Sequence, residues 1–423
     1  MVLAPHPDDE TIGCAGVIQQ ALKAGARVRV AYLTNGEHNE LAFIVYEKRL
    51  IFKQGGFIHM GELRRKEAIK AMESLGLSDR DLTFLGYPDF GSFILFSRYW
   101  DTERPLKDML TRISSVPYKE NLSYGAPYFA ENALADLKRL LTAFRPNKIF
   151  VSHPADSNGD HKAFYLFLQV ALHDLEGQFP APKVYPYLVH CVGWPMPRHY
   201  HSELDLLPPK SFAKEDIGWT RLDLTPEQLE KKRQAILSYR TQTRVSAFYL
   251  LAFGRQNELF GDYPLVELLN QPAAGSGQTR YFGLSHMLQD EEEKQEIETV
   301  ELKEARGVSY AVSGGFFLVK IDKSQELDYK FRSNIYLFGY SRSRPFAKMP
   351  KIRIITKHKL FKVFDKKKLI HPDGVSLELN GDSLLLKVPL AFLGDPDLLL
   401  VSVRASKGVI PVQTAAFRLI ELN

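Results

Sequence analysis

Two spacings of hydrophobic residues alternate along the first half of the chain. Short apolar runs at Val2–Ala4 and Val28–Leu33 predict buried strands, and the apolar residues between Glu10 and Lys23 recur at the spacing of one helix face. Gly25 ends this predicted helix. A strand, a helix and a second strand within about thirty residues form a βαβ unit, which implies parallel strands joined by a right-handed crossover.

The alternation continues as far as residue 265. Helices are predicted at Glu62–Leu75, Asn132–Phe144, His161–Leu175 and Pro226–Phe253, and strands at Leu82–Leu85, Lys148–Ser152 and Tyr185–Val192. Alternating strands and helices are typical of an α/β layer structure. We therefore expect a Rossmann-like domain over residues 1–265, in which helices cover both faces of a parallel sheet.

Helical spacing largely disappears after residue 265. Residues 266–305 contain a turn-rich stretch and an acidic stretch, Gln289–Glu304, which indicate a linker or a solvated helix. Beyond them, short apolar runs predict strands at Phe316–Ile321, Ile335–Tyr340, Ile352–Thr356, Val375–Leu379, Ser383–Val388, Leu398–Val403 and Ala416–Leu419. Many short strands are typical of a β-sandwich, so we expect an all-β, sandwich-like domain over residues 306–423.

Length and cysteine content narrow the possible chemistry. A chain of 423 residues is long enough for two or three domains. Its two cysteines, Cys14 and Cys191, are too few for a disulfide framework or a four-thiolate zinc site. Any metal ligands are therefore histidines and carboxylates. The net charge of +5 is too small by itself to predict nucleic-acid binding.

The apolar runs predict no membrane segment, since none reaches the ~18–20 residues that span a bilayer. The N-terminus also lacks the basic and apolar segments of a secretory signal. We therefore expect a cytoplasmic location for the sequence as written. The first predicted strand, however, has only three residues, Val2–Ala4, where five or six are usual. An upstream start that carries a leader, and hence export, remains the alternative.

The densest group of reactive side chains follows the first predicted strand. His6, Asp8, Asp9 and Glu10 place one imidazole and three carboxylates within five residues. The loop falls at the carboxyl end of a parallel strand, where α/β proteins bind ligands. The glycines nearby lack the spacing of a dinucleotide-binding fingerprint, which argues against a nicotinamide or flavin cofactor. The cluster is either a cation site or an N-capping group of the following helix.

A second group follows the strand predicted at Lys148–Ser152 and also opens a helix. It consists of His153, Asp156, Asn158, Asp160 and His161. Because the carboxyl ends of parallel strands meet at one edge of a sheet, the two groups are expected to converge on a single ion. Two histidine nitrogens and one carboxylate oxygen, with an open position for water, are the ligand set of a hydrolytic zinc site.

These two groups carry a family resemblance. The sequence resembles the PIG-L/LmbE-like family of zinc-dependent N-acetylglucosaminyl deacetylases: APHPDDETIGCAG matches the family's first motif, and SHPADSNGDHKA is similar to its second. Weaker matches are YLTNGE, RRKEAIKAMESLG, FLGYPD, YRTQ and NELF. The resemblance covers residues 1–265, about three-fifths of the chain.

The resemblance implies a function and roles for individual residues. It implies that His6, Asp9 and His161 hold Zn²⁺, that Asp8 is the general base, and that the substrate is an N-acylated amino sugar or glycoconjugate. Two alternatives stay open. One is a deacylase of a non-sugar or long-acyl amide, and the other is a glycan-binding protein whose hydrolase domain is inactive.

One position departs from the family pattern. Many members have a histidine three residues before the last ligand, where this chain has Asn158. An Asn amide can donate a hydrogen bond to an oxyanion but carries no charge, and Asn158 is equally well explained as a helix cap. His153 or His190 are candidates for the missing imidazole, although a packing role for His190 is as well supported.

The remaining candidates are supporting residues. Arg64 aligns with a family arginine on a helix with the pattern R-x-x-E, which is expected to point towards the site; the alternative is a surface ion pair with Glu67. Asp156 and Asp160 are expected to orient His161 or to cap its helix. Glu10 belongs to the first helical turn, where it is a candidate for substrate contact.

The second half carries most of the positive charge. Between Lys320 and Lys368 there are fifteen Lys or Arg and four Asp or Glu, interleaved with aromatic residues. Buried aromatics that alternate with solvated lysines explain this pattern most simply. Contact with a glycan is the second interpretation, and nucleic-acid binding is the least favoured.

Overall fold

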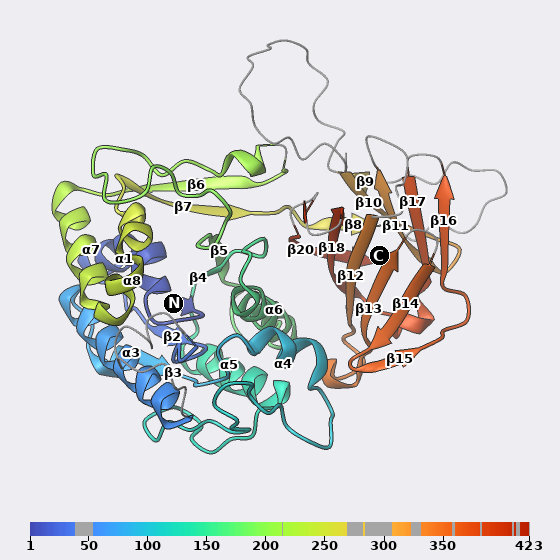
Figure 1. The fold of residues 1–423 in the computed structure, drawn as a ribbon, viewed down its shortest axis with the longest axis horizontal. Helices are drawn as coiled ribbons and strands as arrows, with labels where there is room; N and C mark the ends of the chain where they lie inside the picture. Colours follow the sequence, from blue (N-terminus) through green and yellow to red (C-terminus); the bar gives the residue numbers. More distant parts are fainter. Residues whose placement is uncertain are drawn as a thin grey trace, which may run out of the picture. The chain divides into compact units, whose positions relative to one another are not determined.

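The computed structural model describes residues 1–38, 54–213, 215–268, 282–283, 307–322, 331–357, 360–380, 383–407, 410–411 and 415–422. The chain divides into two compact units (Figure 1). Unit 1 consists of Met1–Ala213 and Ile217–Asp262, and unit 2 of Lys214–Asp216 and Tyr263–Asn423. The acidic stretch Gln289–Glu304 lies outside the described residues.

Unit 1 is built on a mixed sheet of seven strands in the order β3-β2-β1-β4-β5-β7-β6. Its strands are β1 (Val2–Ala4), β2 (Val30–Tyr32), β3 (Leu82–Phe84), β4 (Lys148–Ser152), β5 (Lys183–Tyr187), β6 (Gly218–Asp223) and β7 (Asn257–Asp262). The first five are parallel, whereas β6 and β7 pair antiparallel with each other, and β7 pairs antiparallel with β5. The expectation of a wholly parallel sheet is therefore wrong at this edge. β6 is mostly exposed, and its apolar residues Trp219 and Leu222 are separated by polar ones, so it carries no apolar run that predicts it.

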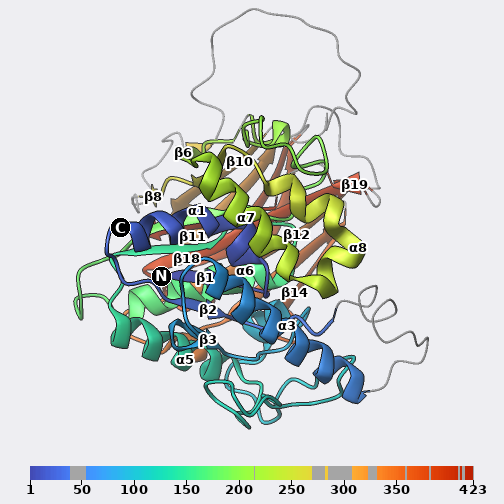
Figure 2. The same cartoon turned by 90° about the vertical axis from the view of Figure 1, so that its left-hand side faces the viewer.

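Helices cover both faces of this sheet (Figures 1 and 2). On one face lie α1 (Asp9–Lys23), α3 (Gln54–Ser74), α7 (Pro226–Ser238) and α8 (Arg240–Leu250), and on the other α4 (Ser92–Arg98), α5 (Ala130–Phe144) and α6 (Gly159–Asp174). Contacts of α7 with α1 and α3, and of α6 with α4 and α5, agree with this grouping.

Two predicted elements end early. The helix expected at Pro226–Phe253 is broken at Tyr239, whose ψ of 69° is not helical, and it is kinked again at Ser246. The strand expected at Tyr185–Val192 ends at Tyr187. Beyond it, the N–H groups of Val189 and His190 donate to the carboxylate of Asp156 instead of to a neighbouring strand. Both deviations arise from tertiary contacts around the loops at the carboxyl ends of the strands.

The central position of β1 brings the two reactive loops together. Val2 pairs with Val30 of β2 and with Phe150 of β4, and all three residues of β1 are buried. The loop after β1 therefore lies beside the loop after β4. A three-residue strand suffices here because it is paired along both edges.

Unit 2 is rich in strands, as expected. One sheet has the order β16-β17-β11-β10-β9, and the other has the order β15-β14-β13-β12-β18-β20-β8, with β19 paired to β18. The strands are β8 (Val266–Leu268), β9 (Phe282–Gly283), β10 (Gly307–Ser313), β11 (Phe316–Asp322), β12 (Phe331–Tyr340), β13 (Lys351–Lys357), β14 (Leu360–Asp365), β15 (Lys368–Ile370), β16 (Ser376–Asn380), β17 (Ser383–Pro389), β18 (Leu398–Lys407), β19 (Ile410–Pro411) and β20 (Phe417–Leu422). Side chains of both sheets, such as Phe317 and Leu337, belong to one hydrophobic core. The assignment to the sandwich class stays a prediction.

The aromatic residues between Lys320 and Lys368 mainly pack inside unit 2. Phe338, Tyr340 and Phe346 are buried, and Tyr336, Phe361 and Phe364 are half-buried; Tyr329 lies outside the described residues. This burial favours the interpretation of core aromatics alternating with solvated lysines. Among the described residues, no helix is long and apolar enough to cross a membrane.

A buried ion pair ties three elements of unit 1 together. Lys232 of α7 lies 2.8 Å from Glu258 of β7, and both side chains are almost fully buried. The same carboxylate accepts hydrogen bonds from the N–H groups of Gly16 and Val17 in α1. Removing one partner of a buried pair leaves an uncompensated charge and costs about 3–5 kcal/mol.

We expect Lys232→Met to lower the free energy of unfolding of unit 1 by about 3–5 kcal/mol. Urea unfolding followed by tryptophan fluorescence reports unit 1 alone, because Trp100, Trp194 and Trp219, the three tryptophans of the chain, all lie in it. The control is Arg233→Met on the same helix, whose half-exposed pair with Glu230 is screened by water and contributes little to stability. If Lys232→Met and Arg233→Met lower the free energy of unfolding equally, the structural role of the buried pair is refuted.

Candidate metal centre

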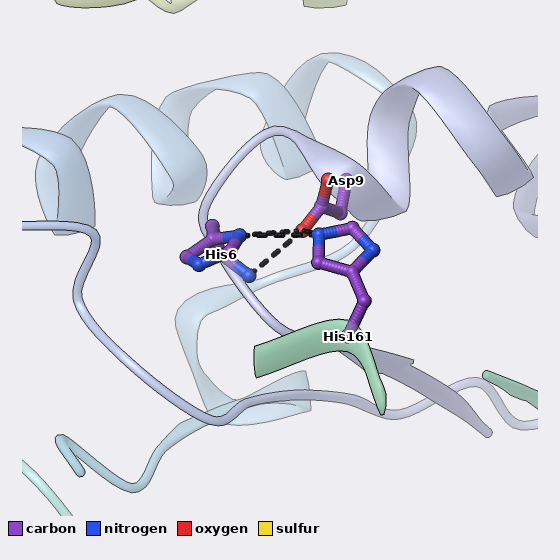
Figure 3. A group of neighbouring side chains, drawn as sticks. All are labelled: His6, Asp9 and His161. Atoms are coloured by element: carbon purple, nitrogen blue, oxygen red, sulfur yellow. Dashed lines mark hydrogen bonds and ion pairs between the residues drawn. The ribbon is translucent and has the colours of Figure 1, made fainter. Parts of the chain in front are cut away.

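Three ligand atoms converge where the loops after β1 and β4 meet (Figure 3). Asp9 Oδ2 lies 3.1 Å from His6 Nδ1 and 3.1 Å from His161 Nε2, and the two nitrogens are 3.3 Å apart. All three side chains are buried. These are the residues that the family resemblance implies as ligands, and the structure brings them together from segments more than 150 residues apart.

The outer nitrogens of both imidazoles face carboxylates. His6 Nε2 lies 3.1 Å from Asp89 and 3.2 Å from Asp160, and His161 Nδ1 lies 3.1 Å from Asp156. A ligating histidine commonly donates its other N–H to such a carboxylate, which fixes its tautomer and its orientation. We therefore assign the protons to the outer nitrogens. Asp160 orients His6, not His161 as expected, whereas Asp156 orients His161 as expected.

This assignment turns three lone pairs towards one another. His6 Nδ1, His161 Nε2 and the Asp9 carboxylate all present acceptor atoms to the same small space, which suits a cation. The surrounding charges agree: burial opposes protonation of His161, but the negative charges of Asp156 and Asp9 outweigh it and raise the pKa of His161 to about 9. The donor set and its electrostatic potential thus fit a metal ion.

Asp8 lies beside the ligands in a conformation that its neighbours impose. Its φ is 124°, a left-handed value that is uncommon for a residue other than glycine. Its N–H donates to Glu10 Oε2 at 3.0 Å, and Glu10 in turn accepts hydrogen bonds from the hydroxyls of Thr11 and Tyr239. Glu10 is fully buried, so it holds the Asp8 backbone in place and is not placed to contact substrate.

Arg64 of α3 is buried against the same loop. Its Nη2 donates to Pro7 O at 2.7 Å and lies 3.3 Å from Asp8 Oδ2, while Nη1 donates to Gly36 O at 2.7 Å. A Cβ on Gly36 would collide with the guanidinium. Burial raises the pKa of Asp8 to about 8 against the opposing charge of Arg64. Arg64 therefore points into the site, and the alternative of a surface pair with Glu67 does not apply.

Glu67 instead binds the segment that breaks the predicted last helix. Its carboxylate accepts from the N–H of Thr241 at 2.9 Å and from the Thr241 hydroxyl at 2.5 Å. Thr241 is two residues from Tyr239, the partner of Glu10. The YRTQ segment thus braces both the loop after β1 and the helix that carries Arg64.

A cavity of about 530 Å³ opens onto the metal centre. Its polar lining includes His6, Asp8, Asp9, Arg64, Asp89, Asn158, His190, His38 and Gln242, and its apolar lining includes Ile12, Phe90, Met109, Leu110, Val189, Tyr249 and Leu250. This size is within the range of small-molecule sites. The cavity combines charged groups near the ligands with an extended apolar wall.

Asn158 and His190 both line this cavity. The Asn158 side-chain oxygen caps α6 by accepting from the N–H of Asp160 at 2.8 Å, so the expected cap role is present, and it occupies only the oxygen of the amide. The His190 ring lies 4.8 Å from the ring of His161 and is stacked near Tyr249. Of the two imidazoles considered as a replacement for the family histidine, His190 is the one at the cavity.

His153 occupies a different environment. It is fully buried and stacks against Trp219 and Phe212, with ring centroids 6.0 and 5.9 Å away, and its Nδ1 accepts from the N–H of Ala155. It does not line the cavity, so it is a packing residue and the expectation that it might serve the site is wrong. Burial lowers its pKa to about 3.

Several cavity residues were not named as site residues from the sequence, although Asp89 and Gln242 stand in the weaker family matches FLGYPD and YRTQ. Asp89 follows β3, and His38 follows β2; the His38 N–H donates to Asp89 at 2.8 Å, and its Nε2 lies 3.0 Å from Asp108. Phe90 and Gln242 complete the set. Position at the carboxyl ends of β2 and β3 is the signal that would have identified Asp89 and His38, since the other two reactive loops follow strands of the same sheet.

We expect His153→Phe to reduce the loss of stability of unit 1 in mild acid. Because the folded pKa of about 3 lies below the unfolded value of about 6.5, the neutral ring stabilises the fold fully above pH 6.5, and this contribution is lost as the pH falls towards 3. Between pH 7 and pH 5 the loss is about 2 kcal/mol. Urea unfolding at both pH values measures it. His59→Phe, at an exposed position, serves as the control. If the free energy of unfolding depends on pH identically in wild type and in His153→Phe, the low pKa assigned to His153 is contradicted.

Comparisons with known proteins agree with the motifs. Residues 1–172 match the family model described as "PIG-L: GlcNAc-PI de-N-acetylase". A curated protein of Bacteroides thetaiotaomicron, described as "Putative glucosamine-6-phosphate deaminase-like protein", is 24% identical over 273 residues, which cover 62% of this chain and 37% of that protein. This chain thus matches little more than a third of the length of the Bacteroides protein.

Solved structures with a similar chain trace have low sequence identity. N,N'-diacetylchitobiose deacetylase from Pyrococcus horikoshii is 17% identical, with a TM-score of 0.35 over 61% of this chain and 81% of that chain. The 4-carboxy-2-hydroxymuconate hydratase of Pseudomonas putida is 18% identical, with a TM-score of 0.36 over 63% and 96%.

The family match contains His6, Asp8, Asp9, Arg64 and His161, and it ends well before residue 265. Tyr239 and Glu258 of unit 1 lie beyond it. Over residues 1–172, the resemblance to the PIG-L family that the two motifs predict is therefore confirmed.

Proposed function

We propose that this protein is a zinc-dependent hydrolase that removes an N-acetyl or related N-acyl group from an amino sugar or glycoconjugate. One observation carries the proposal. The acceptor atoms of His6, Asp9 and His161 lie within 3.3 Å of one another at a cavity that the Asp8 carboxylate also lines. The family description, which names a GlcNAc de-N-acetylase, supports the substrate class.

The spacing of the ligand atoms supports zinc. Bonds of about 2.0–2.1 Å in tetrahedral directions separate neighbouring ligand atoms by about 3.3 Å, and the three separations here are 3.1, 3.1 and 3.3 Å. Two imidazole nitrogens and one carboxylate oxygen leave a fourth position open. A zinc ion held by these residues would lower the pKa of a bound water to about 7 and would polarise a carbonyl oxygen.

Asp8 is the general base of the proposed reaction. It is adjacent in sequence to the ligand Asp9, and its carboxylate lines the cavity beside Arg64. A nearby cation lowers a carboxyl pKa, which keeps Asp8 ionised and able to take a proton from the attacking water. The same carboxyl group then returns the proton to the amine as the C–N bond breaks.

Other cavity residues assist the polar transition state. With the oxygen of Asn158 engaged in the cap, its amide N–H groups are the donors that face an oxyanion. His190 supplies an imidazole beside His161 and stands in for the histidine that the family has at position 158. Arg64 fixes the loop that carries Asp8 and adds positive charge to the cavity.

A second candidate is a deacylase of a long-acyl or non-sugar amide. The apolar wall formed by Ile12, Leu110, Val189 and Leu250 favours it, because such side chains would bind an acyl chain. Contact between unit 2 and a glycan is a further part of the proposal, supported by the basic residues between Lys320 and Lys368.

We expect the protein to bind one Zn²⁺ per chain and Asp156→Asn to weaken that binding about 10–100-fold, because loss of the carboxylate releases the orientation of His161. Competition with a chelator of known affinity measures the change. Asp205→Asn, in an exposed pair with Arg221, is the matched control. Wild-type protein that binds no zinc would refute the proposed metal, and unchanged affinity in Asp156→Asn would refute the role of this carboxylate.

We expect Asp8→Asn to lower the turnover number about 10²–10⁴-fold with the zinc content unchanged, since it removes the base but no ligand. The assay measures acetate and primary amine released from GlcNAc-containing glycans by zinc-loaded protein. Asp79→Asn, at an exposed position, is the control. Near-normal turnover in Asp8→Asn would show that Asp8 is not the base, and a zinc-loaded wild type that releases no acetate from any N-acetyl sugar would favour the second candidate.

A further inference from the structure

Phe90 presents an aromatic ring at the cavity in an unusual way. The residue is 65% exposed, although large apolar side chains are normally buried, and it lines the cavity. Its φ is 55°, in the left-handed region that bulky residues rarely adopt. Such a conformation persists only where the surroundings determine it, and it is found mostly at ligand and active sites.

The surroundings of Phe90 do determine its position. Its N–H donates to Asp160 Oδ2 at 2.6 Å, and the same oxygen lies 3.2 Å from His6 Nε2. The backbone of Phe90 is therefore connected to a metal ligand through one carboxylate. Ser92 N donates to the other oxygen of Asp160 at 2.9 Å and fixes the following turn.

The ring itself is backed by His38. The two rings are stacked, with centroids 6.1 Å apart and an angle of 12° between their planes. His38 is held in turn by Asp108 through Nε2 and by Asp89 through its N–H. The Phe90 ring thus lies beside a held imidazole and presents exposed aromatic surface at the cavity.

From this geometry we propose that Phe90 is the platform against which the pyranose ring of the substrate packs, so that it selects amides carried by a sugar. The inference rests on the proposed function. The C–H groups on one face of a pyranose carry partial positive charge and suit the negative face of an aromatic ring. The hydroxyls at the rim of the sugar then meet the polar cavity residues, of which Asp89 is the direct neighbour of Phe90.

Substitution of Phe90 separates this role from a structural one. Asp160 accepts from the backbone N–H of residue 90, so side-chain variants retain that bond, and the zinc content should not change. Phe90→Leu keeps an apolar side chain but has no aromatic face, Phe90→Ala removes most of the surface, and Phe90→Trp keeps the face. Tyr124→Ala is the control, because Tyr124 is similarly exposed, at 57%, and does not line the cavity.

The test is steady-state kinetics of zinc-loaded enzyme on a GlcNAc-containing glycan, with competitive inhibition by glucosamine and by acetate. We expect Phe90→Leu to raise KM and the glucosamine inhibition constant about tenfold, and Phe90→Ala about 10–100-fold. In Phe90→Leu and Phe90→Ala, the turnover number and the inhibition constant of acetate should stay within about twofold of the wild-type values. The KM of Phe90→Trp should resemble that of wild type.

Two different failures are distinguishable. If the wild type releases acetate from the glycan but Phe90→Leu and Phe90→Ala keep its KM and its glucosamine inhibition constant, the platform is refuted and the proposed function stands. If the wild type deacylates only amides that carry no sugar, the proposed function itself fails and the platform fails with it.

Discussion

The negative potential of buried carboxylates around two converging imidazoles is the constraint on which the architecture of the site depends. His6 Nδ1, His161 Nε2 and Asp9 Oδ2 are held about as close together as three ligands of one small cation would be. Burial strengthens the attraction of these carboxylates for a positive charge, because little water screens it. The three carboxylates behind the imidazoles increase the negative potential and at the same time keep the lone pairs pointed inward.

Elements far away in the sequence hold this arrangement in place. The unusual φ of Asp8 is supported by Glu10, which is bound by Tyr239 from the break between α7 and α8. Arg64 binds the same loop from α3. Since these partners lie on different elements of unit 1, the geometry of the reactive loop depends on the fold of the whole unit. Of the non-glycine residues with a positive φ, Asp8 and Phe90 line the cavity.

Local patterns predicted most of this organisation, and tertiary contacts decided the rest. The apolar runs identified β1, β2, β3 and β4, and the position of two reactive loops at the ends of β1 and β4 predicted that they converge. The antiparallel edge was missed because β6 is mostly exposed and has no continuous apolar run, and the break at Tyr239 was missed because the apolar spacing continues across it. Propensity and periodicity contain no information about long-range partners.

The candidate site was predictable to a similar degree. His6, Asp9 and His161 stand in dense motifs, which made them visible, whereas Asp89 ends only a weaker family match and His38 is an isolated polar residue after a short strand. His153 stands in a motif as well, yet it packs against Trp219. Membership in a motif therefore does not determine on which side of a loop a residue lies, and only the fold separates His153 from His161.

Unit 2 depends on different physics from unit 1. Its aromatic residues pack mainly inside, as with Phe338 and Phe346, and in β14 the exposed Lys362 alternates with the half-buried Phe361 and the buried Val363. This alternation stabilises the sheets whether or not the exposed charges bind a ligand. The chemistry that we propose accordingly involves only side chains of unit 1.

The central claim is that two histidines and one aspartate of unit 1 hold a zinc ion. X-ray absorption at the zinc edge of the loaded protein tests it most directly. We expect a first shell of two imidazole nitrogens and oxygen ligands at about 2.0–2.2 Å, with no sulfur. A shell that contains sulfur at about 2.3 Å, or one without imidazole scattering, would contradict it.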